Sequence, residues 1–291
     1  MTAADPSDPP KLAAFASVIG AYRNVLSRPR ALAQLAALPV FATIAILYVI
    51  ETVPQLLPGS GFLFLGNPVL LLAYLGIPLS YFSLVWLRFR MLGRSASILI
   101  GSPWIGALSQ SMAYFVLGFV WFLLTPRLAV YAYTPIVLLL PAEAAPGIEG
   151  LPLVIFWLGL SVSSLYLTAR LFLAVPAIAA GFSGSPVAAW RTSAGLGGQL
   201  FRAFLLLVLS FLVVGVFSAY VADALEGLLT MLPRGSQSQV FGLPAGFYTS
   251  AVVTALGLVV STAVLSEFLA AAFRQMMSRK SPNQDILKRF D

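Results

Sequence analysis

Long apolar runs without a single charged side chain dominate this sequence. They cover residues 31–50, 67–87, 151–169, 203–222 and 247–266. Each run is close to the ~20 residues that a helix needs to cross a hydrocarbon core of ~30 Å. Because the runs are continuously apolar rather than alternating, they predict membrane-spanning helices and not the strands of a barrel. The pattern therefore predicts an all-α integral membrane protein.

A sixth apolar run at 111–141 is interrupted by Pro126, Arg127 and Pro135. We interpret it as one kinked span, with a broken or re-entrant hairpin as the alternative. The expected spans are then about 31–53, 67–87, 111–141, 151–172, 203–223 and 247–270. Residues 11–280 form a single membrane domain in this interpretation, between a disordered N-terminus at 1–10 and a cytoplasmic tail at 281–291.

The basic residues give this topology an orientation. Six spans place most of the 17 Lys and Arg residues on one side, and acidic Glu51, Glu143, Glu149, Asp223 and Glu226 on the other. The basic residues that share a side are Lys11, Arg23, Arg28, Arg30, Arg88, Arg90, Arg94, Arg170, Arg191, Arg202, Arg274, Arg279, Lys280, Lys288 and Arg289. Lys and Arg accumulate in short cytoplasmic loops. Both termini are therefore expected in the cytoplasm.

Three shorter segments on that side, 11–27, 96–108 and 186–197, are expected to lie along the membrane interface. The first has an apolar face and a polar face at helical spacing. The apolar face carries Leu12, Phe15, Ile19, Tyr22 and Leu26, and the polar face Ser17, Arg23 and Asn24. A helix docked on the spans of the same chain is the alternative for this segment.

The third segment has the sequence features of a helix start. Ser185 suits the N-cap and Pro186 the first helical position. Trp190 and Arg191 then suit the level of the lipid headgroups. We assign Arg23 and Arg202 to the same level.

Composition narrows the range of functions. The chain has 59% hydrophobic and 9% charged residues, with a net charge of +7. Anionic lipids of the cytoplasmic leaflet account for the positive charge, so we expect no nucleic-acid partner. There is no Cys and no His, which removes thiol chemistry, the commonest metal ligand and the commonest general base. We therefore predict no cofactor, no metal and no enzymatic activity.

One stretch matches a catalytic pattern. GFSG at 181–184 fits the GxSG pattern of rhomboid-type intramembrane proteases. In that chemistry a His on another helix activates the serine. Because the chain has no His, an intramembrane hydrolase has almost no support in the sequence.

Charges within the spans are candidates for a clamp or a cavity. Arg170 and Glu267 lie near the cytoplasmic ends of two spans, and we predict that they pair, because a lone charge at a helix centre costs ~2.5–3.5 kcal/mol. Arg127 lies deeper, with Glu51 or Asp223 as its possible partner. An unpaired Arg127 would instead indicate a water-filled cavity.

Pro176 is the predicted hinge of the fourth span. It follows Arg170 by six residues and precedes a Gly/Ser cluster. We expect it to end the regular helix and to turn the chain into a segment along the membrane surface.

Residues 169–209, ARLFLAVPAIAAGFSGSPVAAWRTSAGLGGQLFRAFLLLVL, resemble a bacterial superfamily of multi-span proteins that includes the membrane domain of glycerophosphodiester phosphodiesterases. The matching positions are Arg170, Pro176, Arg191, Ser193, Gly198 and Arg202. The chain departs from the family where GFSGS replaces an acidic Gly-rich turn and Gln199 replaces Asn. The resemblance implies a helical module of the bacterial inner membrane without the catalytic domain.

Two functions follow from these observations. The first is a non-enzymatic inner-membrane module that engages anionic lipid headgroups or a partner membrane protein in envelope or complex organisation. The alternative is a transporter of small solutes or lipids, with a polar cavity among spans three, four and six lined by Arg127, Arg170 and Glu267.

Overall fold

The computed structural model describes residues 13–56, 68–93, 105–115, 150–182, 184–231, 239–240 and 243–280. This part of the chain is helical apart from one pair of two-residue strands. The elements with assigned bounds are α1 (Ala14–Leu26), α2 (Pro29–Leu56), α4 (Pro68–Leu92), α6 (Gly150–Leu171), α7 (Ala174–Ala179), α8 (Pro186–Thr192), α9 (Gly197–Met231), β1 (Gln239–Val240), β2 (Leu243–Pro244) and α10 (Ala245–Lys280). Residues 105–115 form a further helix.

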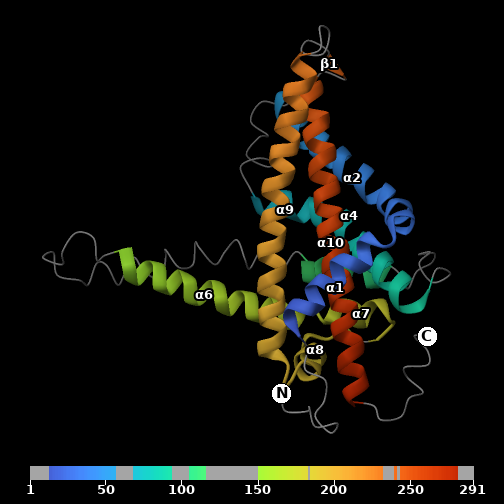
Figure 1. The fold of residues 1–291 in the computed structure, drawn as a ribbon, viewed down its shortest axis with the longest axis vertical. Coiled ribbons are helices and arrows are strands. Elements are labelled where there is room, and N and C mark those ends of the chain that lie inside the picture. The colour runs from blue at the N-terminus through green and yellow to red at the C-terminus, as the bar shows by residue number, and fades with distance from the viewer. Residues whose placement is uncertain are drawn as a thin grey trace, which may run out of the picture.

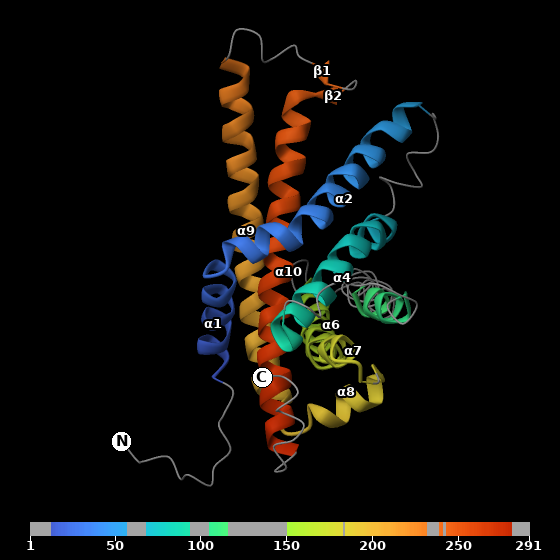
Figure 2. The same cartoon turned by 90° about the vertical axis from the view of Figure 1, so that its right-hand side faces the viewer.

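The two longest helices, α9 and α10, form an antiparallel pair along the long axis of the molecule (Figures 1 and 2). They contain 35 and 36 residues, which corresponds to roughly 50 Å each at a rise of 1.5 Å per residue. The strands β1 and β2 pair antiparallel at the tip between them. This pair is the frame on which the other helices pack.

Four described helical stretches are long and apolar enough to cross a membrane. They are Pro29–Thr52, Leu158–Ala179, Gly197–Leu228 and Gly246–Met277. One face of α9 exposes Leu212, Val213, Val216 and Phe217, which lipid tails can cover. The prediction of an all-helical protein is thus confirmed, and these helices support a membrane protein. The predicted helix at 67–87 is present as α4, but α4 is not among the four stretches.

Helix α6 departs from the expected bundle arrangement. It extends sideways from the α9–α10 pair, across the long axis (Figure 1). Its outer part exposes Ile155, Leu158 and Val162. The sequence pattern predicted the helix at 151–172 correctly, and its direction relative to α9 and α10 comes only from the structure.

Helix α1 packs on α9 and α10 (Figure 2). It buries Val18, Ala21 and Val25, whereas Phe15 and Ile19 point outward. Small residues face the protein because they let two helices approach closely. Of the two interpretations of 11–27, docking on the chain's own helices is the one observed. The face of α1 that points away from these helices is apolar and exposed.

The buried core lies where α4, α7 and α10 meet. Phe82, Trp86, Leu173, Phe268 and Leu269 are almost completely inaccessible there. Their burial positions the polar groups described below, because close-packed side chains hold their neighbours in single rotamers.

Pro176 does not have the role predicted for it. The regular helix ends at Leu171, before the proline, and Pro176 is the third residue of the short helix α7. A proline in the first turn removes no helical hydrogen bond, since its N–H would have no partner there. Pro176 and most of α7 are buried. The segment after α6 is therefore part of the core and not a surface helix.

Other predicted boundaries also change. Residues 105–115 form one continuous helix, so the expected break between an interfacial segment ending at 108 and a span starting at 111 is wrong. Helix α8 ends at Thr192, and a turn with Gly195 at φ +81° leads into α9 at Gly197. Residues 1–12, 94–104, 116–149 and 281–291 lie outside the described part, and with them Arg127 and most of the segment 111–141.

Candidate functional site

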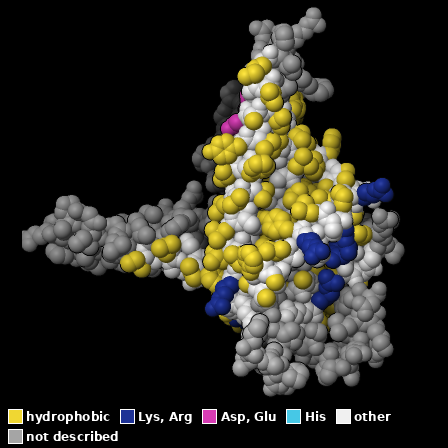
Figure 3. Space-filling model, in the orientation of Figure 1, with side chains coloured by type: hydrophobic (Ala, Val, Ile, Leu, Met, Phe, Trp, Pro, Cys, Tyr) yellow, Lys and Arg dark blue, Asp and Glu magenta, His cyan; other side chains and the backbone are white. Residues whose placement is uncertain are grey.

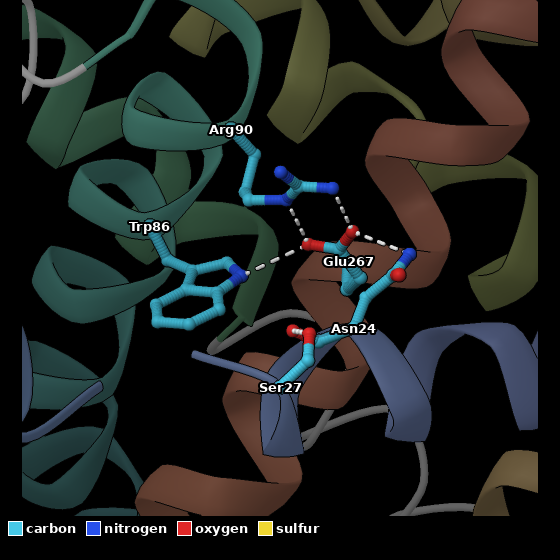
Figure 4. Close-up of polar contacts among 5 residues, drawn as sticks. All are labelled: Asn24, Ser27, Trp86, Arg90 and Glu267. Carbon is cyan, nitrogen blue, oxygen red and sulfur yellow. Dashed lines mark hydrogen bonds and ion pairs between the residues drawn. The ribbon is translucent and has the colours of Figure 1, made fainter. Parts of the chain in front are cut away.

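A buried carboxylate joins three helices. Glu267 of α10 has a side chain that is 1% exposed, and Arg90 of α4 binds it through two hydrogen bonds (Figure 4). The Arg90 Nε donates to Oε2 and Nη2 donates to Oε1, each over 2.6 Å. Trp86 Nε1 donates to Oε2 over 3.3 Å, and Asn24 Nδ2 of α1 donates to Oε1 over 3.1 Å. We call these four residues the Glu267 cluster.

The Glu267 cluster is saturated. Both carboxylate oxygens accept two hydrogen bonds, and the guanidinium and carboxylate meet in the planar, two-bonded geometry that gives strong ion pairs. A buried charge is stable only when it is paired and hydrogen-bonded in this way. The arrangement suits a structural clamp between α1, α4 and α10, since neither oxygen is left to accept a proton from a substrate.

The predicted pair of Arg170 with Glu267 is not formed. Glu267 binds Arg90 instead, and Arg170 binds groups of α6, α8 and the turn after α8. The prediction rested on the similar positions of both residues in their spans, but the neighbour of a side chain depends on how the helices are arranged in space, and α6 lies across the α9–α10 pair.

Arg170 lies in a cage without a carboxylate. Its side chain is 7% exposed, and no acidic side chain in the described residues lies within ion-pair distance of it. Nε donates to Ser193 Oγ over 2.7 Å, Nη2 donates to the Trp190 carbonyl oxygen over 2.7 Å, and Nη1 donates to the Tyr166 hydroxyl over 3.3 Å. The Trp190 ring covers the guanidinium at 3.4 Å from the ring centroid. We call this set the Arg170 cage.

The Arg170 cage fixes α8 against the end of α6. Cation–π contact and hydrogen bonds to neutral acceptors replace the counter-ion, because the indole face is negative. Tyr166 also packs edge-on against Trp190. A side chain at Gly197 would collide with the Tyr166 hydroxyl, so it would displace Tyr166 from its place beside Arg170.

Charges separate along the molecule. On the face drawn in Figure 3, the Lys and Arg side chains lie over the half of the molecule that carries α1 and α8, and the visible acidic side chains lie toward the opposite end of α9. Arg23, Arg191 and Arg202 are exposed at the basic end, and Trp190 is 40% exposed. Asp223 is exposed on the far half of α9, and Glu51 is partly exposed near the end of α2.

A cavity of about 420 Å³ lies between α9 and α10. Its wall includes Asp223 and the hydroxyl residues Ser218, Ser250, Thr254, Ser261 and Thr262. Neither Arg170 nor Glu267 lines it. This cavity lies between the fifth and sixth predicted spans and is therefore not the polar cavity among spans three, four and six that the transporter alternative required.

The sequence interpretation missed Arg90, Trp86 and Asn24 as partners of Glu267. Trp86 and Arg90 are four residues apart, so they share one face of α4 and could have been recognised as a polar pair. Asn24 was assigned only to the polar face of its helix. No signal in the sequence connects α1 with residue 267.

The described residues contain no group of three or more His, Cys, Asp or Glu side chains that could hold a metal ion. The chain matches no protein-family model, no curated protein and no solved structure. The resemblance to the membrane domain of glycerophosphodiester phosphodiesterases therefore stays a prediction.

We expect the Asn24→Ala variant to loosen α1 while the rest of the fold remains. The substitution removes the one polar bond from α1 to Glu267, and Arg90 and Trp86 continue to satisfy the carboxylate. A hydrogen bond to a charged group at a partly exposed site contributes about 1.5 kcal/mol. Hydrogen exchange of the α1 amides should accelerate about tenfold. Ser27→Ala, which removes only a hydroxyl bonded to the Asn24 carbonyl, is the control, and equal exchange in both variants would refute the assignment.

Proposed function

We propose that this protein is a non-enzymatic module of a cytoplasmic membrane, and that its basic end binds anionic lipid headgroups. The observation that carries the proposal is the gathering of arginines at one end, next to exposed apolar side chains of α1 and α8. Both termini are on the cytoplasmic side in this proposal. Anionic lipids of that leaflet attract basic side chains, with about 1 kcal/mol for each Lys or Arg near the surface.

The exposed side chains at this end have the character of an interfacial surface. Phe15 and Ile19 of α1 are 68% and 50% exposed, and Val187 and Trp190 of α8 are also exposed. Apolar side chains next to arginines are typical of helices that lie at the boundary between headgroups and acyl chains. Trp is enriched at the same level.

The Arg170 cage supports the proposal by giving α8 a fixed position. The guanidinium of Arg170 packs against the Trp190 ring, and the backbone carbonyl of Trp190 accepts a hydrogen bond from the same guanidinium. A headgroup surface made of a short helix needs such a restraint, because a helix of seven residues is not stable by itself. Arg191 follows Trp190 directly and supplies the exposed charge.

We expect Arg191→Gln to lower the preference for anionic over zwitterionic lipid about fivefold. One basic side chain near the surface contributes about 1 kcal/mol of attraction, which corresponds to this factor. The measurement is native mass spectrometry of protein exchanged into mixed micelles with equal phosphatidylglycerol and phosphatidylcholine, read as the ratio of the two lipid adducts. Arg191→Lys keeps the charge and should keep the ratio. If all three proteins retain the two lipids equally, the proposal is wrong.

A partner membrane protein is the other occupant that the basic end suits. Mass spectrometry of the protein extracted gently from its own membranes separates the two cases. One retained class of anionic phospholipid supports lipid binding. A second protein at fixed stoichiometry, retained without lipid, would contradict it and assign the surface to an assembly.

Transport remains the second candidate, because of the cavity between α9 and α10. The charges first assigned to such a pathway do not support it: Arg170 and Glu267 are engaged in the cage and the cluster, and Arg127 lies outside the described residues. The hydroxyl residues and Asp223 are what favour a ligand in this cavity.

A further inference from the structure

We infer that the cavity between α9 and α10 binds an amphipathic cation, with an ammonium group at Asp223 and an alkyl chain along the cavity. The inference goes beyond the proposed function, which concerns the opposite end of the molecule. It rests on the volume, the shape and the charge of the cavity and on the residues that line it.

The volume suits a small ligand. At about 420 Å³ the cavity falls within the ~300–1,000 Å³ range of small-molecule sites. Small residues of both helices line it, among them Gly215, Ala219 and Gly257. The two helices approach closely beside it, since a side chain added at Gly257 would come within 3.0 Å of the Ser218 hydroxyl, and one added at Gly246 would meet the carboxylate of Glu226. The space is thus local, and not a general separation of the two helices.

The cavity is elongated and has two different ends. Its α9 wall runs from Phe211 to Asp223, twelve residues or about 18 Å of helix. Because α10 runs antiparallel, Ser250 and Thr254 lie beside the Asp223 end, and Leu265 lies beside the Phe211 end. The Asp223 end therefore carries the one charged group among the described lining residues, and the Phe211 end is lined mostly by apolar side chains, with the hydroxyls of Ser261 and Thr262 among them.

The charge decides which amphiphile fits. Among the described residues no Lys or Arg lines the cavity, and Glu226 adds a second carboxylate one turn beyond Asp223 on the same helix. An anionic headgroup would be repelled there, whereas an ammonium group gains a charge-assisted hydrogen bond to Asp223. Ser250 supplies a neutral acceptor for a second ammonium hydrogen.

The apolar part of the wall accommodates the chain. Val214, Leu258 and Leu265 line it, with Leu79 and Phe115 contributed by neighbouring helices. An alkyl chain that enters this space leaves water and gains close contacts on several sides. The hydroxyls of Ser218 and Ser261 tolerate a methylene chain because a serine in a helix can bond to a carbonyl of its own preceding turn.

The test compares two probes with the same chain and opposite charge, dodecylamine and dodecanoate. Native mass spectrometry of the full chain in a neutral maltoside, titrated with each probe, measures the occupancy of a first, saturable adduct. We expect dodecylamine to form this adduct and dodecanoate to bind at least tenfold more weakly. Equal binding of the two would overturn the inference and indicate a site for neutral chains only.

Two variants locate the adduct. Asp223→Asn is at an exposed position, so it should fold normally and weaken dodecylamine binding about tenfold through loss of a hydrogen bond to a charged group. Thr254→Leu removes a hydroxyl beside Asp223 and narrows that end of the cavity, so it should weaken the adduct while the protein keeps its elution volume. Thr52→Leu, a hydroxyl loss on α2 outside the cavity, is the matched control.

The outcomes are distinct from those of the lipid experiment. Dodecylamine binding that persists in both cavity variants would overturn the inference and leave selection of anionic lipid at the basic end untouched. Conversely, Arg191→Gln should not change dodecylamine binding, since Arg191 belongs to α8 and does not line the cavity.

Discussion

Replacing Arg90 by methionine is expected to lower the free energy of unfolding by about 3 kcal/mol. The substitution leaves Glu267, which is 1% exposed, as a buried carboxylate without its counter-ion. Removal of one partner of a buried pair typically costs ~3–5 kcal/mol. Trp86 and Asn24 still donate to the carboxylate, which places the expected loss at the lower end of that range. Equilibrium unfolding in maltoside micelles with increasing SDS measures it.

A double-variant cycle tests whether the pair is the cause. Glu267→Leu combined with Arg90→Met removes both charges, and a buried pair replaced by apolar groups of similar volume often loses little stability. We expect the double variant to be more stable than the sum of the single changes predicts, by at least 1 kcal/mol. Arg28→Met is the control, because Arg28 is exposed and should change stability by less than about 0.5 kcal/mol. Strict additivity of the two single changes would contradict the clamp.

The Arg170→Lys variant is expected to lose about 2 kcal/mol of stability although it keeps the charge. A lysine ammonium is a point charge, so it cannot reach Ser193, Tyr166 and the Trp190 carbonyl in the fork geometry that the guanidinium provides. It also loses most of the planar contact with the Trp190 ring. Each lost hydrogen bond to a charged group contributes ~1.5–3 kcal/mol, part of which the ammonium recovers.

Local and global readouts distinguish a cage from a diffuse effect. In Arg170→Lys, hydrogen exchange should accelerate more in α8 and the turn that follows it, residues 186–196, than in α10. Arg202→Lys is the matched control, since Arg202 is exposed on α9 and the same change should have no effect there. If Arg170→Lys and Arg202→Lys behave alike, the cage does not hold α8.

The long helices were predictable because their cause is local. A charge-free run of about twenty apolar residues can satisfy its backbone in lipid only as a helix. The predicted ranges 31–53, 203–223 and 247–270 lie in observed helices, the range 151–172 ends one residue beyond α6, and α9 and α10 continue beyond the predicted ends. The start of α8 was predictable for the same reason, since Pro186 suits the first helical position, and Ser185 is the N-cap residue although its side chain makes no capping hydrogen bond.

The partners of the buried charges were not predictable in this way. Arg170 and Glu267 were recognised as groups that need compensation, and each is compensated, but not by the other. The choice of Arg90 for Glu267 depends on the rotation of α4 and α10 about their axes, which is set by packing of Trp86 and Phe268 in the core. Arg170 is likewise compensated by a cation–π contact with Trp190 and not by a carboxylate, and no pattern in a single sequence predicts such a contact.

The sequence by itself determined that this chain is helical and apolar enough for a membrane. It also predicted that most basic residues follow one side of the spans and most acidic residues the other. These properties follow from the composition of single segments, because solvation of a backbone or a charge is a local energy. The tertiary structure alone decided that α6 lies across the α9–α10 pair, that α7 is buried, and that a cavity with Asp223 at one end opens between α9 and α10. These features depend on contacts between residues far apart in the chain, where the fit of side-chain shapes selects one arrangement among many with similar hydrophobic burial.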